Sequence, residues 1–165
     1  MLTALANVCA YNGHNTMEWS KDQSEINKIR ETQINEAVYP DVLLSKRIQY
    51  TYHIMTVANK RHMIVVNGDN EEIIKTLKRI SKKVDPNTII VNVVSKQADL
   101  NKSGLSSFVG EGMNGNPYAE LIVSMESKNI IMNEDVEFSA VSEDEEILKE
   151  MKHVFSNKKI KIKER

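Results

Sequence analysis

Hydrophobic and polar positions follow one another in patterns that predict six elements in the first 95 residues. The first is a strand over residues 3–11, which are apolar, include small and β-branched side chains, and run into the turn signal Asn12-Gly13. The second is a helix beginning at Ser20, because Ser20 and Gln23 have capping-box spacing and apolar residues then recur every three or four positions. The chain is therefore expected to open with a strand, a turn and a helix.

The following segments predict a hairpin, a second helix and a buried strand. Residues 47–57 are rich in Tyr, Thr, Ile and Val, and a tight connection leads from them to a second apolar run at 61–66. Between 73 and 84, apolar residues at helical spacing stand opposite Lys and Arg. Residues 88–94 form an almost unbroken apolar run, typical of a strand that is buried on both faces.

The order of these elements predicts a fold class. Strand, helix, strand, strand, helix, strand is the split βαβ, or ferredoxin-like, arrangement, in which helices pack on one face of an antiparallel sheet. Short connections and the right-handed crossover rule leave few competing topologies. Residues 1–95 are therefore expected to form a βαββαβ unit of the α+β class.

The remaining residues predict a loop and an extension. The stretch 96–117 is polar and glycine-rich, which predicts a loop. Strand patterns follow at 118–125, 136–141 and 160–162, and residues 130–132 are a candidate for a further, short strand. A capping box opens a helix between 141 and 160. Residues 118–165 are thus expected to add a C-terminal ββαβ extension, on the same sheet or packed against it.

Composition narrows the classes of partner. The 165 residues carry a net charge of −1 with both signs mixed, unlike a general nucleic-acid binder or a polybasic membrane anchor. One cysteine, Cys9, fits a reducing cytosol, and its apolar neighbours favour a buried thiol. The histidines show no metal-ligand spacing, and no apolar stretch approaches ~20 residues. We therefore expect a cytoplasmic protein without metal, cofactor, membrane or general nucleic-acid partner.

Two segments are candidate ligand sites. The segment from Gly110 to Gly115 has the sequence G-x-G-x-x-G. The dinucleotide-binding motif requires a helix after it, but a strand is expected here, so the segment is not interpreted as a dinucleotide site. Such a loop either wraps a small anion with backbone N–H groups or is a solvated connection. Its candidate residues are Ser106, Ser107, Gly110, Glu111 and Gly112.

The second candidate site is the polar turn after the first predicted strand. Tyr11, Asn12 and His14 lie there, and loops that lead from strands into helices are good ligand positions. The alternative is a capped turn with Trp19 packed on the helix.

Two resemblances point to one architecture. Residues 65–113, with Val84-Asp85-Pro86-Asn87 before a buried strand and the Phe108 to Met113 segment after it, look like the DUF2179 domain of YitT-type proteins, which is PII-like. The N-terminal part is similar in layout to the phage S-adenosylmethionine lyases, also PII-like and trimeric. In that family an apolar strand ends in an aromatic residue, and a helix carries Asn and Arg three apart. The residues that match this pattern are Val8 to Tyr11, Asn27 and Arg30.

The resemblances, together with the Ile-, Asn- and Lys-rich composition, leave three functions open. The first is a PII-like homotrimer that binds or senses a small nucleotide-like ligand between subunits. The second is an S-adenosylmethionine-degrading lyase with a phage anti-restriction role, although no match for the catalytic glutamate of that family is found. The third is a viral inhibitor that binds a protein in the host cytoplasm.

Overall fold

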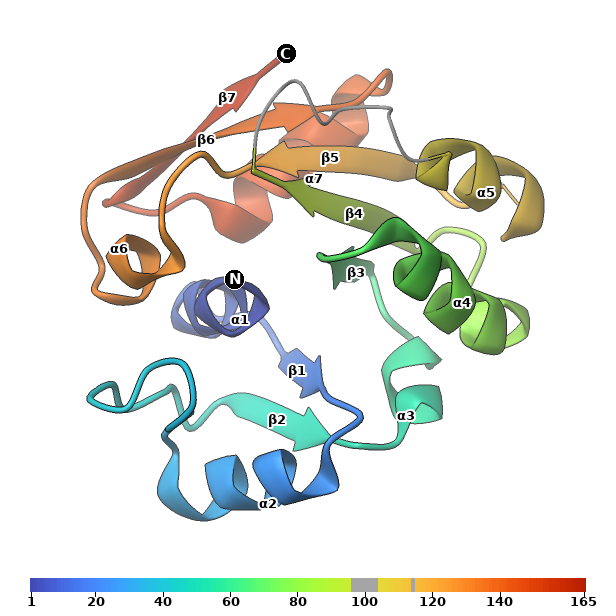
Figure 1. The fold of residues 1–165 in the computed structure, drawn as a ribbon. Coiled ribbons are helices and arrows are strands. Elements are labelled where there is room, and N and C mark those ends of the chain that lie inside the picture. The colour runs from blue at the N-terminus through green and yellow to red at the C-terminus, as the bar shows by residue number, and fades with distance from the viewer. Residues whose placement is uncertain (96–103, 114) are drawn as a thin grey trace.

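The computed structural model describes residues 1–95, 104–113 and 115–165, in which helices and strands alternate along most of the chain (Figure 1). The helices are α1 (Leu2–Tyr11), α2 (Gln23–Thr32), α3 (Ile54–Ala58), α4 (Asn70–Ile80), the 3-10 helix η1 (Ser81–Lys83), α5 (Leu105–Gly112), α6 (Ser127–Ile131) and α7 (Glu145–Phe155). The strands are β1 (Thr16–Trp19), β2 (Ile48–Thr51), β3 (Met63–Val66), β4 (Ile89–Val94), β5 (Tyr118–Ile122), β6 (Val136–Val141) and β7 (Ile160–Glu164).

The strands form two sheets. β1 and β2 pair in parallel as a two-stranded sheet, with Thr16 opposite Ile48. The second sheet has the order β3-β4-β5-β6-β7, and its pairs are parallel except for β5 with β6. Each parallel neighbour is reached through a crossover helix, which is how parallel strands are connected.

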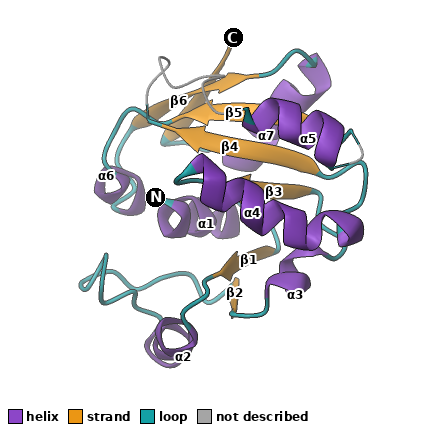
Figure 2. Cartoon of the chain, turned by 45° about the vertical axis from the view of Figure 1, so that its right-hand side comes forward, coloured by secondary structure: helices purple, strands orange, loops and turns teal. Residues whose placement is uncertain are grey.

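Helices cover both faces of the sheets, and each face has its own hydrophobic core (Figure 2). One core contains side chains of α1, α2, α6 and α7, and the other contains side chains of α3, α4 and α5. β4 lies between them, with Val91 and Val93 in the first core and Ile90 in the second. This two-sided burial explains why the sequence of β4 is an unbroken apolar run.

The ferredoxin-like, PII-like α+β fold class predicted from the sequence is wrong. A ferredoxin-like sheet is antiparallel with helices on one face, whereas this fold is mostly parallel with helices on both faces. The predicted hairpin of 47–57 with 61–66 is also absent. β2 ends at Thr51 and pairs with β1, and α3 occupies the second half of the expected strand.

The expected first strand at residues 3–11 is the helix α1. Seven of its ten residues are buried, so it lacks the polar face that marks helical periodicity in a sequence. The next helix begins at Gln23 instead of Ser20, because Asp22 accepts hydrogen bonds from the N–H groups of Ser24 and Glu25 and so caps α2. The residues just before this cap form β1.

Other predicted elements are confirmed, and two more are corrected. The helix after Asp69, the strands at 89–94, 136–141 and 160–164, and the helix at 145–155 are present. The stretch 96–117 was predicted as a loop, but residues 105–112 within it form α5, while 96–103 and 114 lie outside the described residues. Residues 130–132, considered for a strand, lie at the end of α6.

Candidate functional site

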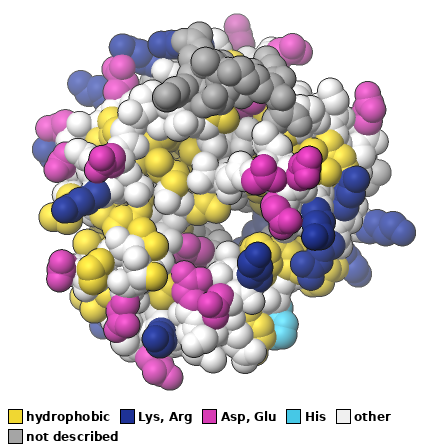
Figure 3. Space-filling view, viewed as in Figure 1, with side chains coloured by type: hydrophobic (Ala, Val, Ile, Leu, Met, Phe, Trp, Pro, Cys, Tyr) yellow, Lys and Arg dark blue, Asp and Glu magenta, His cyan; other side chains and the backbone are white. Residues whose placement is uncertain are grey.

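A pocket of about 1030 Å³ separates the two sheets. All four residues of β1 line one side of it, and all four residues of β3 line the other. α1 contributes Leu2, Leu5 and Ala6, while α4 contributes side chains from the opposite face. Figure 3 shows the resulting hollow near the centre of the molecule, with acidic and basic side chains at its rim.

The pocket lies where the winding of the chain changes face. α2, which connects β1 to β2, packs in one core, whereas α4, which connects β3 to β4, packs in the other. In open α/β sheets, ligands bind outside the carboxyl ends of the strands at this kind of switch point. The residues directly after β1 and β3 are therefore the first candidates for a ligand site.

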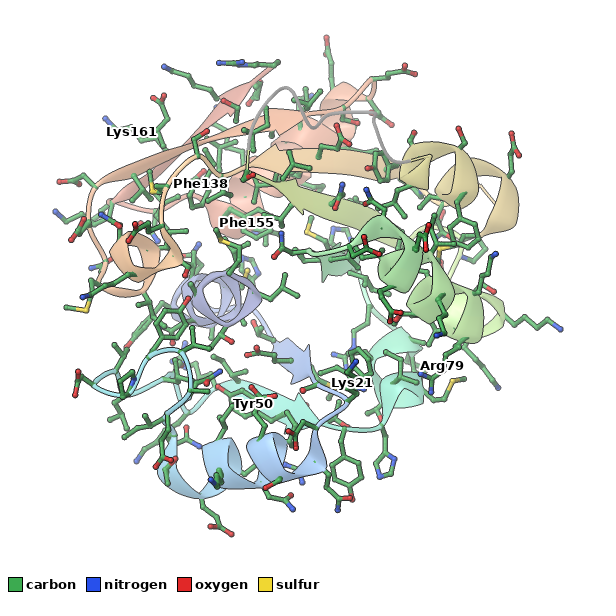
Figure 4. All side chains as sticks on the ribbon, viewed as in Figure 1. Lys21, Tyr50, Arg79, Phe138, Phe155 and Lys161 are labelled. Carbon is green, nitrogen blue, oxygen red and sulfur yellow. The ribbon has the colours of Figure 1, made fainter. Side chains whose placement is uncertain are left out.

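The residues after β1 leave one basic side chain available. The Ser20 hydroxyl donates to Glu25 Oε2 at 2.7 Å, and Asp22 is occupied in capping α2. Lys21, between them, is exposed and lines the pocket at the end of β1 (Figure 4). This end of the strand therefore offers a cation to an anionic ligand.

The residues after β3 form a rigid turn. Asn67 Nδ2 donates to the carbonyl of Val93 at 2.9 Å, which ties the turn to β4. Gly68 has a φ of 132°, a conformation that favours glycine. Asp69 caps α4 by accepting from the N–H groups of Glu71 and Glu72. Because a carboxylate already sits at the N-terminus of α4, an anionic ligand is disfavoured there.

Some residues that line the pocket have buried polar atoms without a hydrogen-bond partner among the described residues. Glu18 Oε1 accepts from the hydroxyl of Thr3 at 2.6 Å, but Glu18 Oε2 is buried without a hydrogen bond, as are His14 Nε2 and Arg61 Nε. Burial raises the pKa of Glu18, and the charge of Glu25 raises it further, while the Thr3 hydrogen bond lowers it. The pocket is therefore apolar with a few convergent polar groups, as ligand sites commonly are.

The candidate residues at the end of α1 have mainly structural roles. Tyr11 is 67% exposed and does not line the pocket, whereas His14 does. Asn12 Nδ2 donates to the carbonyls of Val154 and Ser156 at 2.8 and 3.2 Å. Asn12 thus links α1 to the end of α7, and of these three residues only His14 reaches the pocket.

The other candidates lie elsewhere. Arg30 on α2 donates from Nε and Nη2 to the carbonyl of Tyr50 at 3.1 and 2.6 Å, and Asn27 is exposed on the same helix. The glycine-rich candidates lie on the exposed side of α5, outside the residues that line the pocket; they are Ser106, Ser107, Gly110, Glu111 and Gly112. The structure therefore spreads the candidate residues over separate regions.

Sequence reasoning missed Glu18, Lys21 and Asn67 as site residues. A signal was present for two of them, since Asn67 directly follows a strand and Lys21 lies two residues after one. The strand that ends before Lys21 was not predicted, so its polar neighbour was assigned to the start of a helix. Trp19, the last residue of that strand, donates from Nε1 to the carbonyl of Tyr52 at 3.2 Å.

A mostly parallel sheet with helices on both faces, and a pocket where the winding reverses, defines a Rossmann-like α/β domain. The family model described as "NAD-dependent glycerol-3-phosphate dehydrogenase N-terminus" matches residues 3–123. The chain therefore belongs to this family.

Sequence relatives agree with this assignment. The chain is 21% identical over 163 residues to glycerol-3-phosphate dehydrogenase [NAD(P)+] of Staphylococcus haemolyticus, a match that covers 97% of the chain and 49% of the relative. It is 27% identical over 130 residues to the enzyme of the same name from Acinetobacter baylyi, covering 78% of the chain and 36% of the relative. The chain thus spans about half or less of these curated relatives.

Solved structures share the fold. Glycerol-3-phosphate dehydrogenase from Plasmodium falciparum superposes with a TM-score of 0.82 at 16% identity, over 99% of this chain and 49% of that one. Glycerol-3-phosphate dehydrogenase from Coxiella burnetii superposes with a TM-score of 0.80 at 15% identity, over 99% of this chain and 50% of that one.

The family assignment corrects the functions expected from the sequence. The resemblances to PII-like proteins, to the DUF2179 domain and to phage S-adenosylmethionine lyases are wrong, as are the functions derived from them. The resemblance to the lyases assumed an apolar strand at Val8 to Tyr11, which the structure shows as part of helix α1. No helix within the described residues is long and apolar enough to span a membrane.

Proposed function

We propose that this chain forms the cofactor side of a glycerol-3-phosphate dehydrogenase-type oxidoreductase and binds a nicotinamide dinucleotide at the carboxyl ends of β1 and β3. The family match over residues 3–123 carries the proposal. The pocket at the switch point supports it, because dinucleotides bind in this crevice of Rossmann-like folds. Since the chain spans about half of its relatives, dehydrogenase activity is part of the proposal.

Lys21 is suited to the ribose end of the dinucleotide. In this fold class, an acidic residue near the end of a strand favours the ribose 2′-hydroxyl, whereas a nearby cation favours the 2′-phosphate. Lys21 is an exposed cation two residues after the end of β1, and the neighbouring Asp22 is held in the cap of α2. NADP⁺ is therefore the preferred form under this proposal.

The pyrophosphate is not accommodated by the same residues. The only G-x-G-x-x-G in the sequence begins at Gly110, and its first three residues belong to α5, far along the chain from β1. Lys21 fits the ribose end of a dinucleotide, whereas the G-x-G-x-x-G at Gly110 does not form the strand-to-helix turn that holds the phosphates.

The proposal can be tested by titrating ¹⁵N-labelled protein with millimolar NADP⁺ and NAD⁺. We expect amide shift changes at Ser20–Asp22 and Asn67–Asp69, with tighter binding of NADP⁺. Lys21→Glu should weaken NADP⁺ binding about tenfold, since one charge contact contributes on the order of 1.4 kcal/mol. Lys161→Glu, at an exposed lysine of β7, is the matched control and should bind as wild type. Absent shifts, or equal effects of both variants, would refute the site.

A further inference from the structure

A basic surface lies over the second half of α4 and the 3-10 helix η1. From residue 73 to residue 84 the chain has five Lys or Arg residues and no Asp or Glu. Ile73, Leu77 and Ile80 are buried, so the cations lie on the solvent side of the helix. All five cations are exposed; they are Lys75, Lys78, Arg79, Lys82 and Lys83. Figure 3 shows a group of dark blue side chains at the right of the molecule, where Figure 1 places α4.

Most of these cations have no acidic partner within the fold. Among the described residues, Lys75 alone of the five forms an ion pair, with Glu72 at 3.8 Å. Cations are favoured in the last turn of any helix by its dipole. α7 shows the usual arrangement, since Lys152 in its last turn pairs with Glu164 at 3.1 Å. The dipole therefore explains one or two cations at the end of α4, but not an unpaired group of this size.

An aromatic ring lies beside the unpaired lysines. Phe108 on α5 is half-buried, and Nζ of Lys78 lies 5.6 Å from the centroid of its ring. Such a distance allows a cation–π contact. Ile74, one turn before Lys78, is also partly buried and packs against the same core as Phe108. The surface thus combines cations with a ring and an aliphatic side chain that are each partly exposed.

We name this surface the α4 patch and define it by the members that do not line the pocket between the two sheets. They are Ile74, Lys78, Lys82, Lys83 and Phe108. We propose that the α4 patch docks a short acidic peptide segment of a protein partner. The carboxylates of the segment pair with the three lysines, and one of its apolar side chains packs on Phe108 and Ile74. Charge complementarity gives such a contact its specificity, and partly exposed aromatic side chains are enriched where proteins meet.

The surroundings of the α4 patch favour a short segment over nucleic acid or a membrane. Lys78 and Lys83 are separated by roughly 8 Å along the helix axis, so the lysines span only a few residues of a partner. Exposed acids flank them, namely Glu71 at the start of α4, Asp85 after η1 and Glu111 on α5. A long polyanion or an anionic bilayer would meet these acids as well, whereas a short peptide contacts the lysines alone. The net charge of −1 disfavours the larger anionic surfaces for the same reason.

The probe is the peptide Glu-Asp-Glu-Leu-Asp-Glu-amide with fluorescein at its N-terminus. Fluorescence anisotropy should show saturable binding at low salt that weakens at physiological salt, because exposed charge pairs are screened. Replacing the leucine of the probe by glycine should weaken binding about fivefold, since the apolar contact with the ring is lost. An unchanged affinity would contradict the role of Phe108 and Ile74.

Two triple variants separate the α4 patch from general electrostatics. Charge reversal by Lys78→Glu, Lys82→Glu and Lys83→Glu should weaken binding of the probe by at least about tenfold. The matched control, Lys46→Glu, Lys158→Glu and Lys161→Glu, changes the net charge equally at exposed lysines elsewhere and should bind as wild type. Equal weakening in both variants, or no saturable binding at low salt, would overturn the proposal.

Chemical-shift mapping on the wild-type chain gives a test that needs no variant. The probe should shift amides within residues 74–84 and 105–112, and shifts centred elsewhere would contradict the α4 patch. Oligothymidylate and vesicles of phosphatidylcholine with phosphatidylserine are then used as competitors. If either displaces the probe at a lower concentration of anionic charge than the unlabelled peptide, the surface binds that polyanion and the peptide proposal fails. No nucleotide cofactor is added in these measurements, so their outcome does not depend on the dinucleotide proposal.

Discussion

At the scale of single residues, the two glycines of α5 have different roles. A Cβ on Gly110 would have no heavy atom within 4 Å, whereas a Cβ on Gly112 would lie 2.6 Å from Cε2 of Phe108. Gly110 therefore weakens the helix without a packing reason, while Gly112 gives the Phe108 ring its space.

Gly110→Ala should raise the free energy of unfolding by about 0.5–1 kcal/mol, because alanine loses less backbone entropy in a helix. Gly112→Ala should gain nothing or lose stability, since the Phe108 ring must move. Urea denaturation of both variants measures the difference. A loss of stability in the first variant would mean that Gly110 is needed for a local conformation.

The buried carboxyl group of Glu18 makes stability depend on pH. Its pKa is raised by burial, so the folded state favours the protonated form. The stabilisation from that protonated form is complete below the pKa of the unfolded chain and is lost as pH rises through the folded pKa.

Glu18→Gln should therefore stabilise the protein at pH 7 by on the order of 1 kcal/mol, and the gain should disappear in acid. The amide keeps an acceptor for the Thr3 hydroxyl. Glu143→Gln, at an exposed glutamate, should show no such dependence. Denaturation midpoints between pH 4 and pH 8 test this, and an equal gain at all pH values would contradict it.

At the scale of elements, Asp69 determines where α4 begins. Its Oδ1 accepts from the N–H groups of Glu71 and Glu72 at 3.0 and 3.2 Å. Asp69→Ala should lower the free energy of unfolding by about 1 kcal/mol, and Asp69→Asn should be close to neutral because asparagine caps equally well. Chemical denaturation compares the two. Equal losses would show that the charge, rather than the cap hydrogen bonds, stabilises the helix.

At the scale of the whole molecule, Asn12 joins the two ends of the chain. Its side chain donates to Val154 and Ser156 and accepts from Asn157, more than 140 residues away. α1 also packs on α6 and α7 through the first core. These contacts hold the small β1-β2 sheet, which packs on α1, to the rest of the fold.

Asn12→Ala should destabilise the protein by about 1–3 kcal/mol, because partly buried carbonyl groups lose their donor. Hydrogen exchange should rise most in α1 and β1. Asn129→Ala removes an exposed bond to Glu134 and should cost less than about 0.5 kcal/mol. If both variants behave alike, Asn12 is not the link between the ends of the chain.

The elements that sequence reasoning predicted correctly carry local signals. α4 has a capping aspartate and the apolar positions Ile73, Leu77 and Ile80 on one face. β4 is an apolar run between turn residues, and β6 alternates from Val136 to Val141. In these segments the periodicity of the sequence and the pattern of burial agree, so no distant residue was needed to recognise them.

The incorrect predictions occur where contacts between residues far apart in the chain determine the secondary structure. α1 is buried on most sides, so its sequence resembles a buried strand equally well. β1 has four partly buried residues, and it becomes a strand by pairing with β2 about 30 residues later. The candidate site failed for the same reason, since Lys21 gains its position only from the strand before it.

The sequence alone therefore determined most helices and strands after residue 60, the buried thiol of Cys9, and the burial of β4 on both faces. The tertiary structure decided that α1 is a helix, that the strands are mostly parallel, and that a pocket lies between β1 and β3. Periodicity reports which side of a segment is buried, but strand pairing and the pocket depend on contacts between residues far apart in the chain.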